Sequence, residues 1–463
     1  MSDITAGSVS SGGYSRMYAR LSVTAQPVSV VDRIVTIDTL RGFALLGILV
    51  MNIDDFAIPG AFGGIPLNAF TGDHATLNMI IWAIKWIFFE GRMRGVFAML
   101  FGAGVVLLTE RISKRDGVTS ASDIYMRRNM WLLVMGFLHG VFIWTGDILF
   151  HYGLCALIFL YPFRLLKSRT LIITGTLVSL FIATTSMSLF YLKLPQRLAL
   201  QQQVAAEVSH TSGAHPDAEA VKRAKEWKEL NTSQVTDKEG YAEQVAEVRE
   251  QSYVEGVEAR FTRLYGDRSG RGYLEIFDEF SAMLIGMGLF KNGFLTGRQS
   301  TKVYAWTVAI GFLISVPLSL LGLWHVQQDG FTTWSMSLWL YLPYYLKREA
   351  ASLAITALIL LLMRQGVAKG LWNALSAVGR TALSNYLLTS LIARALFSVG
   401  PWALYGRLEY YQITYVIAAI WAFNIVASML WLRAFRFGPI EWAWRSLTYA
   451  QWQPMRIREP VTA

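Results

Sequence analysis

Charged residues and cysteine are scarce in this chain. Only 16% of its 463 residues are charged, whereas 54% are hydrophobic. A soluble protein of this length would form two or three domains with roughly 25% charged residues, so that class is excluded. The single cysteine, Cys155, excludes an intrachain disulfide scaffold, and the same composition excludes disordered and collagen-like chains. A polytopic membrane protein with a formal net charge of +10 remains.

Long apolar runs recur along the chain after a polar beginning. Residues 1–32 are rich in Ser and Gly and lack the apolar core of a signal peptide, so we expect a disordered cytoplasmic tail. Later runs of roughly 17–23 residues are long enough to cross a bilayer about 30 Å thick. About ten spans are predicted, near residues 35–53, 94–110, 129–145, 147–163, 170–192, 274–290, 302–323, 349–363, 382–399 and 411–432.

Lys and Arg residues predict the orientation of these spans. They cluster in the loops that follow the even-numbered spans, at Arg111, Lys114, Arg115, Arg127, Arg128, Arg164, Lys167, Arg169, Lys291, Arg298, Lys302, Arg364, Lys369, Arg380, Arg433, Arg436 and Arg445. By the positive-inside rule this side is cytoplasmic, so both termini are predicted inside. Lys347 and Arg348 are the exception, because the same count places them outside.

One long hydrophilic stretch, residues 194–272, falls on the outer side. Val254, Val257 and Phe261 recur at helical spacing, which predicts an amphipathic helix. A helical cap over the outer face is one interpretation, and a mobile solvated loop is the other. The predicted fold class is therefore all-α, a polytopic membrane protein with about ten transmembrane helices and an extracytoplasmic helical insert.

This interpretation divides the chain into five parts. They are a disordered cytoplasmic tail (1–32), transmembrane helices one to five (33–193), the extracytoplasmic helical insert (194–272), transmembrane helices six to ten (273–440) and a cytoplasmic interfacial C-terminal tail (441–463). In the last part, Glu441 and Arg445 lie one helical turn apart between tryptophans, as in a helix at the membrane interface. Asn385, in the ninth span, is expected to bond to a neighbouring helix.

Ionisable residues within a span are costly, and the first span carries two. Asp38 and Arg41 are three residues apart, so they share a helix face and are expected to pair. Asn52 follows Arg41 by about three helical turns and points the same way, ~16 Å further along the axis. One face would then present a cation inside and an amide outside. The alternative is that Arg41 snorkels to headgroups and Asn52 caps the helix.

A second charged cluster interrupts the apolar stretch that leads through the second span. Glu90, Arg92 and Arg94 lie beside Gly91. A straight helix from residue 77 to 110 would be about 50 Å long, so we expect a break near Gly91 that turns these charges toward a cavity. The arginines would then suit phosphate oxygens. A structural ion pair between Glu90 and an arginine, joining two helices, is an equal alternative.

Three polar residues stand at the turn between the third and fourth spans. His139 and His151 flank Asp147, and a helical hairpin would bring them close together, with Asp147 orienting one imidazole. Metal binding is not expected, because a third and a fourth ligand are missing. His74 precedes the second span, where a helix N-terminus favours the neutral imidazole that a general base requires. As a loop residue, His74 could equally be idle.

Several strings of the sequence resemble the YeiB-like integral membrane family (domain of unknown function 418). The resemblance covers about residues 33 to 455. It rests on RIVTIDTLRGFALLGILVMN, FFEGRMRGVFAMLFGAG, RRNMWLLVMGFLHGVFIWTGDIL, VGRTALSNYLLTS and WLRAFRFGPIEWAWRSLTYAQWQP. These strings are specific for the family and much less specific for a function.

That family is similar to the transmembrane acyltransferase superfamily, whose members move an acyl group from cytoplasmic acyl-CoA to an acceptor across the membrane. In the glycan-modifying branch the first helix carries an arginine followed by a histidine. Arg41 matches the arginine, whereas Asn52 occupies the histidine position and cannot act as a general base. In the lysosomal branch a catalytic histidine precedes the second helix, and the string DHATLN with His74 looks similar.

The resemblance and the charged residues together predict an acyltransferase that uses acyl-CoA, with acetyl-CoA the expected co-substrate. The predicted catalytic residues are His74, His139 and Asp147. The predicted substrate-binding residues are Arg41, Asn52, Glu90, Arg92, Arg94 and His151. A transporter or flippase for a small molecule or lipid-linked substrate is the alternative, since transporters also use intramembrane charges and broken helices. A non-enzymatic scaffold is a third possibility.

The expected partners are membrane lipids, acyl-CoA and an unknown extracytoplasmic acceptor. Nucleic acid is not expected, because the basic residues are spread over short loops rather than gathered in one patch. The expected location is the bacterial cell (inner) membrane. The sequence leaves open the acyl group, the acceptor and the oligomeric state.

Overall fold

The computed structural model describes residues 34–59, 73–210, 218–231, 238–265, 271–399 and 402–457. Within these residues the regular structure is helical, apart from one isolated β-bridge between Phe435 and Arg456. The all-α prediction is therefore confirmed. The predicted tail of residues 1–32 lies outside the described residues.

The helices follow one another along the whole described chain. In order they are α2 (Val35–Ala57), α3 (Ala75–Phe88), α4 (Arg92–Asp116), α5 (Val118–Phe142), α6 (Leu149–Cys155), η3 (Ala156–Leu160), α7 (Tyr161–Phe163), α8 (Ser168–His210), α9 (Ala218–Asn231), α10 (Lys238–Glu250), α11 (Tyr253–Tyr265), α12 (Arg271–Lys291), α13 (Thr301–Gln328), α14 (Thr333–Met336), η4 (Ser337–Tyr341), α15 (Tyr344–Arg364), α16 (Lys369–Arg380), α17 (Ala382–Arg394), η5 (Ala395–Val399), α18 (Tyr410–Ala434) and α19 (Pro439–Tyr449), where η denotes a π-helical segment.

Five stretches of helix are long and apolar enough to cross a membrane. They are Val35–Ala57, Ala75–Asp116, Ser168–Ser188, Thr301–Gln328 and Tyr410–Ala434. Large apolar side chains lie exposed on several of these helices, for example Leu313 on α13, which is 73% exposed. Exposed apolar surface of this kind requires an apolar solvent. The chain is thus a membrane protein.

The predicted helix break near Gly91 is confirmed. Helix α3 ends at Phe88 and α4 begins at Arg92, and Gly91 between them has φ +69°, in the left-handed region. A Cβ at this position would lie 2.1 Å from the hydroxyl oxygen of Tyr344, so glycine is required for both backbone and space. Another helix boundary differs from expectation, because α8 continues to His210, past residue 194 where the insert was predicted to begin.

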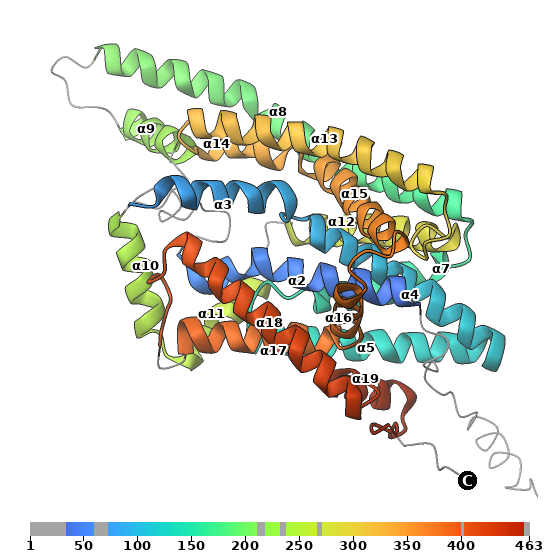
Figure 1. The fold of residues 1–463 in the computed structure, drawn as a ribbon. Coiled ribbons are helices and arrows are strands. Elements are labelled where there is room, and N and C mark those ends of the chain that lie inside the picture. Colours follow the sequence, from blue (N-terminus) through green and yellow to red (C-terminus); the bar gives the residue numbers. More distant parts are fainter. Residues whose placement is uncertain are drawn as a thin grey trace, which may run out of the picture.

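Helix α2 lies inside the bundle and contacts α4, α16, α17 and α18 (Figure 1). Helix α12 packs between α8 and α4, and α13 packs on α15. Helices α10 and α11 lie at one end of the molecule, at the left of Figure 1, and α16 and α19 lie toward the other end. The bundle therefore has two distinct ends, and α2 runs between them.

Helices α9, α10 and α11 occupy most of the predicted insert. Helix α11 is attached to the end of α5, because Tyr253 donates to the carbonyl oxygen of Phe142 (3.1 Å) and Arg260 donates to that of Val141 (2.9 Å). On α10, Tyr241 donates to the carbonyl oxygen of Gly406 (3.1 Å). These bonds attach α11 to the end of α5 and α10 to the segment before α18.

Lys347 and Arg348, which the count of basic residues places on the outer side, are buried near the start of α15. Helix α15 begins at Tyr344, so both residues are helical, and each is at most 2% exposed. Arg348 forms ion pairs with Asp278 on α12 and with its neighbour Glu349, and the ammonium of Lys347 donates to the carbonyl oxygen of Leu340 (3.2 Å). Burial is tolerated because partners on adjacent elements satisfy the charges.

Helices α2 and α16 approach each other through a pair of glycines. A Cβ at Gly379 would lie 1.8 Å from the carbonyl oxygen of Asp38, and a Cβ at Gly42 would lie 1.9 Å from that of Leu375. Both obstacles are backbone atoms, so they cannot rotate away. This contact fixes the start of α2 against the end of α16.

Replacing Gly379 with alanine should separate α2 from α16 and destabilise the protein. We expect a loss of about 1–3 kcal/mol, because overpacking against backbone forces helices apart. The measurement is the melting temperature of the detergent-solubilised protein. Gly370→Ala is the matched control on the same helix, since a Cβ there meets nothing within 4 Å. Equal melting temperatures for both variants would contradict this packing.

Candidate functional site

Two cavities lie along α2, and the predicted residues of this helix are divided between them. Arg41 lines the first cavity, and Asn52 lines the second. Asp38 accepts a hydrogen bond from Arg41 (3.1 Å), which confirms the predicted pair and orients the guanidinium. One face of α2 therefore carries a cation to one cavity and an amide to the other, as its spacing predicts.

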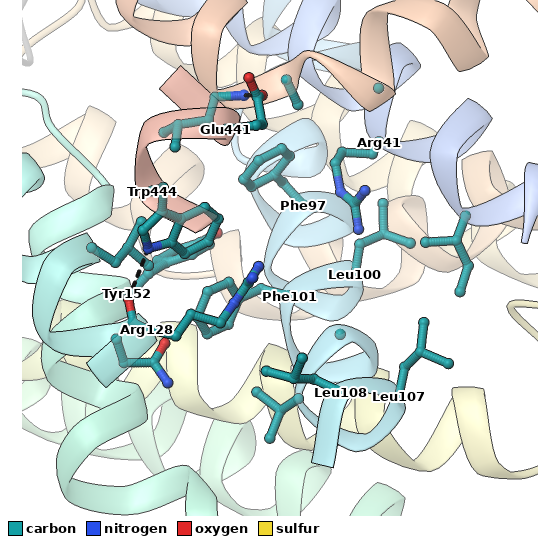
Figure 2. A pocket seen from close by; sticks show the side chains of 18 of the residues that line it. Arg41, Phe97, Leu100, Phe101, Leu107, Leu108, Arg128, Tyr152, Glu441 and Trp444 are labelled. Atoms are coloured by element: carbon teal, nitrogen blue, oxygen red, sulfur yellow. Dashed lines mark hydrogen bonds between the residues drawn. The ribbon is translucent and has the colours of Figure 1, made fainter. Parts of the chain in front are cut away.

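The first cavity, which we call the arginine cavity, has a volume of about 250 Å³. Its charged lining residues are Asp38, Arg41, Arg111, Arg128, Arg380, Glu441 and Arg445. They come from α2, α4, α5, α16 and α19. Figure 2 shows Arg41 and Arg128 extending into the same space from different helices. Five arginines against two carboxylates make this cavity a site for anions.

Apolar side chains form the rest of this cavity's wall. Phe97, Leu100 and Phe101 of α4 face the arginines in Figure 2. Trp444 of α19 stacks against the Arg128 guanidinium, 3.8 Å from its ring centre, and donates from Nε1 to the carbonyl oxygen of Arg128 (2.9 Å). The cavity therefore combines a cationic part with an apolar part, which suits a molecule with an anionic group and an apolar one.

Glu441 anchors α19 over the arginine cavity. Its carboxylate accepts hydrogen bonds from the backbone N–H groups of Leu383 (2.6 Å) and Ser384 (3.2 Å), and from the Ser384 hydroxyl. These N–H groups belong to the first turn of α17, so the carboxylate caps that helix. Burial raises the pKa of Glu441, while the bonds from Ser384 and Leu383 lower it.

Arg445 lies one helical turn after Glu441 and faces the same cavity. Its guanidinium stacks on Phe437, 4.6 Å from the ring centre. Burial lowers the pKa of Arg445, and the nearby Arg41 lowers it further, whereas Tyr449 and Glu441 raise it. Guanidinium groups that repel one another in a partly apolar cavity favour binding of an anion between them.

The second cavity, which we call the acidic cavity, has a volume of about 430 Å³. Its lining carboxylates are Asp54, Asp55, Glu90, Asp147 and Glu279, its lining aromatic residues are Trp82, Trp86, Phe89, Trp144 and Tyr341, and its other ionisable residues are Arg94 and His151. Asn52, Glu90, Arg94, Asp147 and His151 were predicted for the site from the sequence. The structure thus brings together five of the nine predicted residues in this cavity.

A wall between the two cavities holds the pair of His139 and Asp147. Ile148 lines both cavities, Asp147 lines the acidic one, and Tyr386 lines the arginine one. His139 Nδ1 lies 2.8 Å from Asp147 Oδ1, and Tyr386 donates weakly to the same oxygen (3.4 Å). The other oxygen of Asp147 accepts from the Phe150 N–H (2.8 Å) at the start of α6. Asp147 therefore both orients His139 and caps a helix.

This contact determines the tautomer of the neutral His139 ring. A carboxylate only accepts hydrogen bonds, so His139 donates through Nδ1, which leaves Nε2 as the acceptor in the neutral ring. Among the described residues Nε2 has no hydrogen-bond partner, and the side chain is 2% exposed. The close approach of α5 to the start of α6, which brings the pair together, depends on Gly136, where a Cβ would lie 2.1 Å from the Phe150 nitrogen.

The remaining predicted residues lie in three different settings. Arg92 is buried and donates to the carbonyl oxygen of Glu90 (2.5 Å) and to Ser319 on α13 (2.9 Å), so it joins helices. Arg94 donates to the Tyr344 hydroxyl (3.0 Å). His151 Nδ1 lies 4.0 Å from Glu279. Arg92 therefore joins helices through hydrogen bonds, whereas Arg94 and His151 line the acidic cavity. The ion pair of Glu90 with an arginine stays a prediction.

His74 lies apart from both cavities. It precedes α3, and its Nδ1 lies 3.1 Å from Glu409, the N-cap residue of α18. Its ring packs on Tyr411 at 4.9 Å, and its side chain is 48% exposed. Within the described part of the chain, His74 does not line either cavity. Its predicted catalytic role remains a prediction.

The arginines of the first cavity, except Arg41, were missed as site residues. Arg111, Arg128, Arg380 and Arg445 were used only to orient the spans, because their positions in loops satisfy the positive-inside rule. Trp444 was expected at the headgroup level but is 9% exposed and packs in the cavity wall. The available signal was the spacing of Glu441 and Arg445, which places both on one face of a helix.

A helical membrane protein with two charged cavities along one central helix is the class that fold and site define. Residues 289–451 match a family described as a protein of unknown function (DUF418). The chain is 33% identical over 428 residues to the uncharacterized protein YeiB of Escherichia coli (strain K12), covering 90% of this chain and 96% of that protein. It is 27% identical over 444 residues to the uncharacterized protein YxaH of Bacillus subtilis (strain 168), covering 94% of this chain and 99% of that protein.

The chain therefore belongs to the YeiB-like DUF418 family. This confirms the family resemblance found in the sequence.

Replacing Glu441 with alanine should release α19 from α17 and destabilise the protein. The buried N–H groups of Leu383 and Ser384 would lose their acceptor, which costs about 1–3 kcal/mol. Glu441→Gln keeps one acceptor oxygen and should lose less. The measurement is the melting temperature of the purified protein, and an alanine variant as stable as the glutamine variant would contradict the capping role.

Proposed function

We propose that the protein is a membrane acyltransferase that moves an acyl group from cytoplasmic acyl-CoA to an extracytoplasmic hydroxyl or amine. The observation that carries the proposal is the arginine cavity, where five guanidinium groups meet an apolar wall beside a buried His–Asp pair. An acyl-CoA has the matching chemistry, with phosphates at one end and an acyl thioester at the other. Guanidinium groups bind phosphate oxygens in a bidentate manner.

The proposed donor lies in the arginine cavity. Its phosphates would contact Arg41, Arg128 and Arg445, and its acyl end would follow Phe97 and Phe101 toward the wall between the cavities. Acetyl-CoA is the expected co-substrate. The acceptor would enter the acidic cavity and reach the same wall from the other side.

His139 is the proposed base, held by Asp147. Its Nε2 takes the proton of the acceptor hydroxyl or amine, and the oxygen or nitrogen attacks the thioester carbonyl carbon. The C–S bond breaks, and the thiolate of CoA leaves and receives the proton from His139. The products are the acylated acceptor and free CoA. Asp147 stabilises the imidazolium that forms between the two steps.

The membrane arrangement is part of the same proposal. All ten predicted spans would cross the bacterial inner membrane, with both termini in the cytoplasm and the part from 194 to 272 outside. The proposal places the arginine cavity at the cytoplasmic face, where acyl-CoA is available. In support, Arg111, Arg128, Arg380 and Arg445 belong to the clusters that the positive-inside rule assigns to that face.

A transporter or flippase is the second candidate. The observation in its favour is that the two cavities meet at Ile148, so a small rearrangement of one wall would connect them. Such a protein would move its substrate without breaking a bond. The experiment below separates the candidates, since label transferred from acyl-CoA requires chemistry.

Labelled acetyl-CoA tests the proposed reaction. In membrane vesicles that expose the cytoplasmic face, the wild-type protein should transfer label to endogenous membrane acceptors. Arg41→Ala and Arg445→Ala should each weaken acetyl-CoA binding by about tenfold, because each removes a charge-assisted bond to phosphate. His139→Ala should leave binding intact and lower transfer by roughly 10²–10⁴-fold.

Matched variants control this test. Arg433→Ala removes an exposed arginine of α18 that does not line the arginine cavity, and it should bind acetyl-CoA like the wild type. His74→Ala distinguishes the two predicted bases. If His74→Ala loses acetyl transfer and His139→Ala does not, the base is His74. The proposal fails if acetyl-CoA binding is unaffected in both cavity arginine variants, or if labelled acetyl groups never leave CoA.

A further inference from the structure

The acidic cavity has an unusual combination of side chains. Three tryptophans, a tyrosine and a phenylalanine line it together with five carboxylates and a single arginine. Neutral ligands need hydrogen-bond partners but no such excess of negative charge. Aromatic rings combined with carboxylates are the groups that hold organic cations.

The charge excess remains after the internal ion pairs are considered. Asp54 pairs with Lys85 (2.5 Å), and Asp147 pairs with His139 (2.8 Å). Glu279 lies 4.0 Å from His151, and Asp55 and Glu90 line the cavity with Arg94 as the lining arginine. The lining thus contains more carboxyl groups than basic groups, which a cationic ligand would complement.

The aromatic wall is fixed in place. The rings of Trp82 and Trp86 lie 5.7 Å apart, and Trp86 meets Tyr341 edge-on at 6.0 Å. Trp82 is further held by Phe331 at 5.8 Å. A preorganised set of rings loses little entropy on binding, which favours recognition of a small cation.

The protein already binds one ammonium group in this way next to the cavity. The Lys85 ammonium lies 4.7 Å above the ring centre of Tyr410 and 2.5 Å from a carboxylate oxygen of Asp54. Tyr410 also donates to the other oxygen of Asp54 (2.9 Å). A carboxylate and an aromatic face thus bind an ammonium group at the edge of the acidic cavity.

Trp144 supplies a separate indication of a ligand. It lines the acidic cavity and is 6% exposed. Its Nε1 lies near Asp55 but has no hydrogen-bond acceptor of good geometry within the described residues. The Asp55 carboxyl group is the nearby acceptor for this buried N–H, and a hydroxyl oxygen on a bound molecule would supply a better-aligned one.

We propose that the acidic cavity binds a small organic ammonium compound that also carries a hydroxyl group, with Trp82, Trp86 and Tyr341 around the cation and Asp55 and Glu90 as its counter-charges. Only the identification of this compound as the acyl acceptor rests on the proposed function. The binding itself is independent of acyl-CoA and of the arginine cavity.

Labelled choline is the probe that tests this binding. Full-length purified protein should bind it saturably without acyl-CoA, and unlabelled choline or ethanolamine should compete. The neutral compound 3,3-dimethylbutan-1-ol has the shape of choline without its charge, and it should compete at least about tenfold more weakly. Glucose, a neutral polyol, should not compete.

Variants show whether the choline occupies the acidic cavity. Trp86→Leu and Asp55→Asn should each weaken choline binding by about tenfold, whereas Trp86→Phe, which keeps an aromatic face, should lose less. Trp306→Leu is the matched control, because this tryptophan is 66% exposed on α13 and does not line the cavity. A melting temperature for each variant identifies any that fails to fold, and Trp86→Phe serves as the test if Trp86→Leu does not fold.

The outcomes distinguish this proposal from the acyltransferase proposal. Arg445→Ala should bind choline like the wild type while it transfers less acetyl. Wild-type protein that binds choline but transfers no acetyl group from CoA overturns the proposed function alone. Equal competition by 3,3-dimethylbutan-1-ol, competition by glucose, or absence of saturable choline binding overturns the cation site. Choline binding that is unchanged in both Trp86→Leu and Asp55→Asn overturns its location.

Discussion

Pairing of buried charges is the constraint on which this bundle depends. An isolated charge in an apolar medium costs so much free energy that the protein would unfold or the group would become neutral. Lys85 has Asp54, Arg348 has Asp278 and Glu349, and His139 has Asp147. Except for Arg348 with Glu349, which lie in one helix, these pairs join separate elements: α2 with α3, α12 with α15, and α5 with the turn before α6. The ion pairs therefore link elements that the apolar packing alone would not hold in register.

The same constraint explains why the cavities lie where they do. Charged side chains that bond to a neighbouring helix, as Arg92 does to Ser319, are buried between the helices. Charged side chains at a helix break or a turn, such as Glu90 and Asp147, line a cavity. Breaks in the helices, at Gly91 and around residue 145, thus place polar groups in cavities within an otherwise apolar bundle.

Local features of the site were predictable from the sequence, because helix geometry alone determines them. The pairing of Asp38 with Arg41, the break at Gly91 and the opposite placement of Arg41 and Asn52 all follow from spacing and length. The bond from Asn385 to Ser428 on α18 (2.8 Å) follows from the cost of an unsatisfied amide in a span.

The rest required the three-dimensional structure. The arginine cavity is built from α2, α4, α5, α16 and α19, which are far apart in the sequence, and no spacing rule links them. An arginine in a loop also has two explanations, membrane orientation and ligand binding, and the sequence pattern is identical for both. The ion pair of Arg348 could not be predicted either, since its partner Asp278 comes from a helix 70 residues away.

Asp147 contributes both to the stability of the fold and to the proposed chemistry. One of its oxygens caps α6, and the other holds His139. The cap fixes the carboxylate before any substrate arrives, so the orientation of the imidazole costs no rearrangement during a reaction. A histidine oriented by a carboxylate in this way is useful only if a substrate can reach its second nitrogen. In the proposed reaction, a substrate would reach that nitrogen at the wall that contains Ile148 and Tyr386.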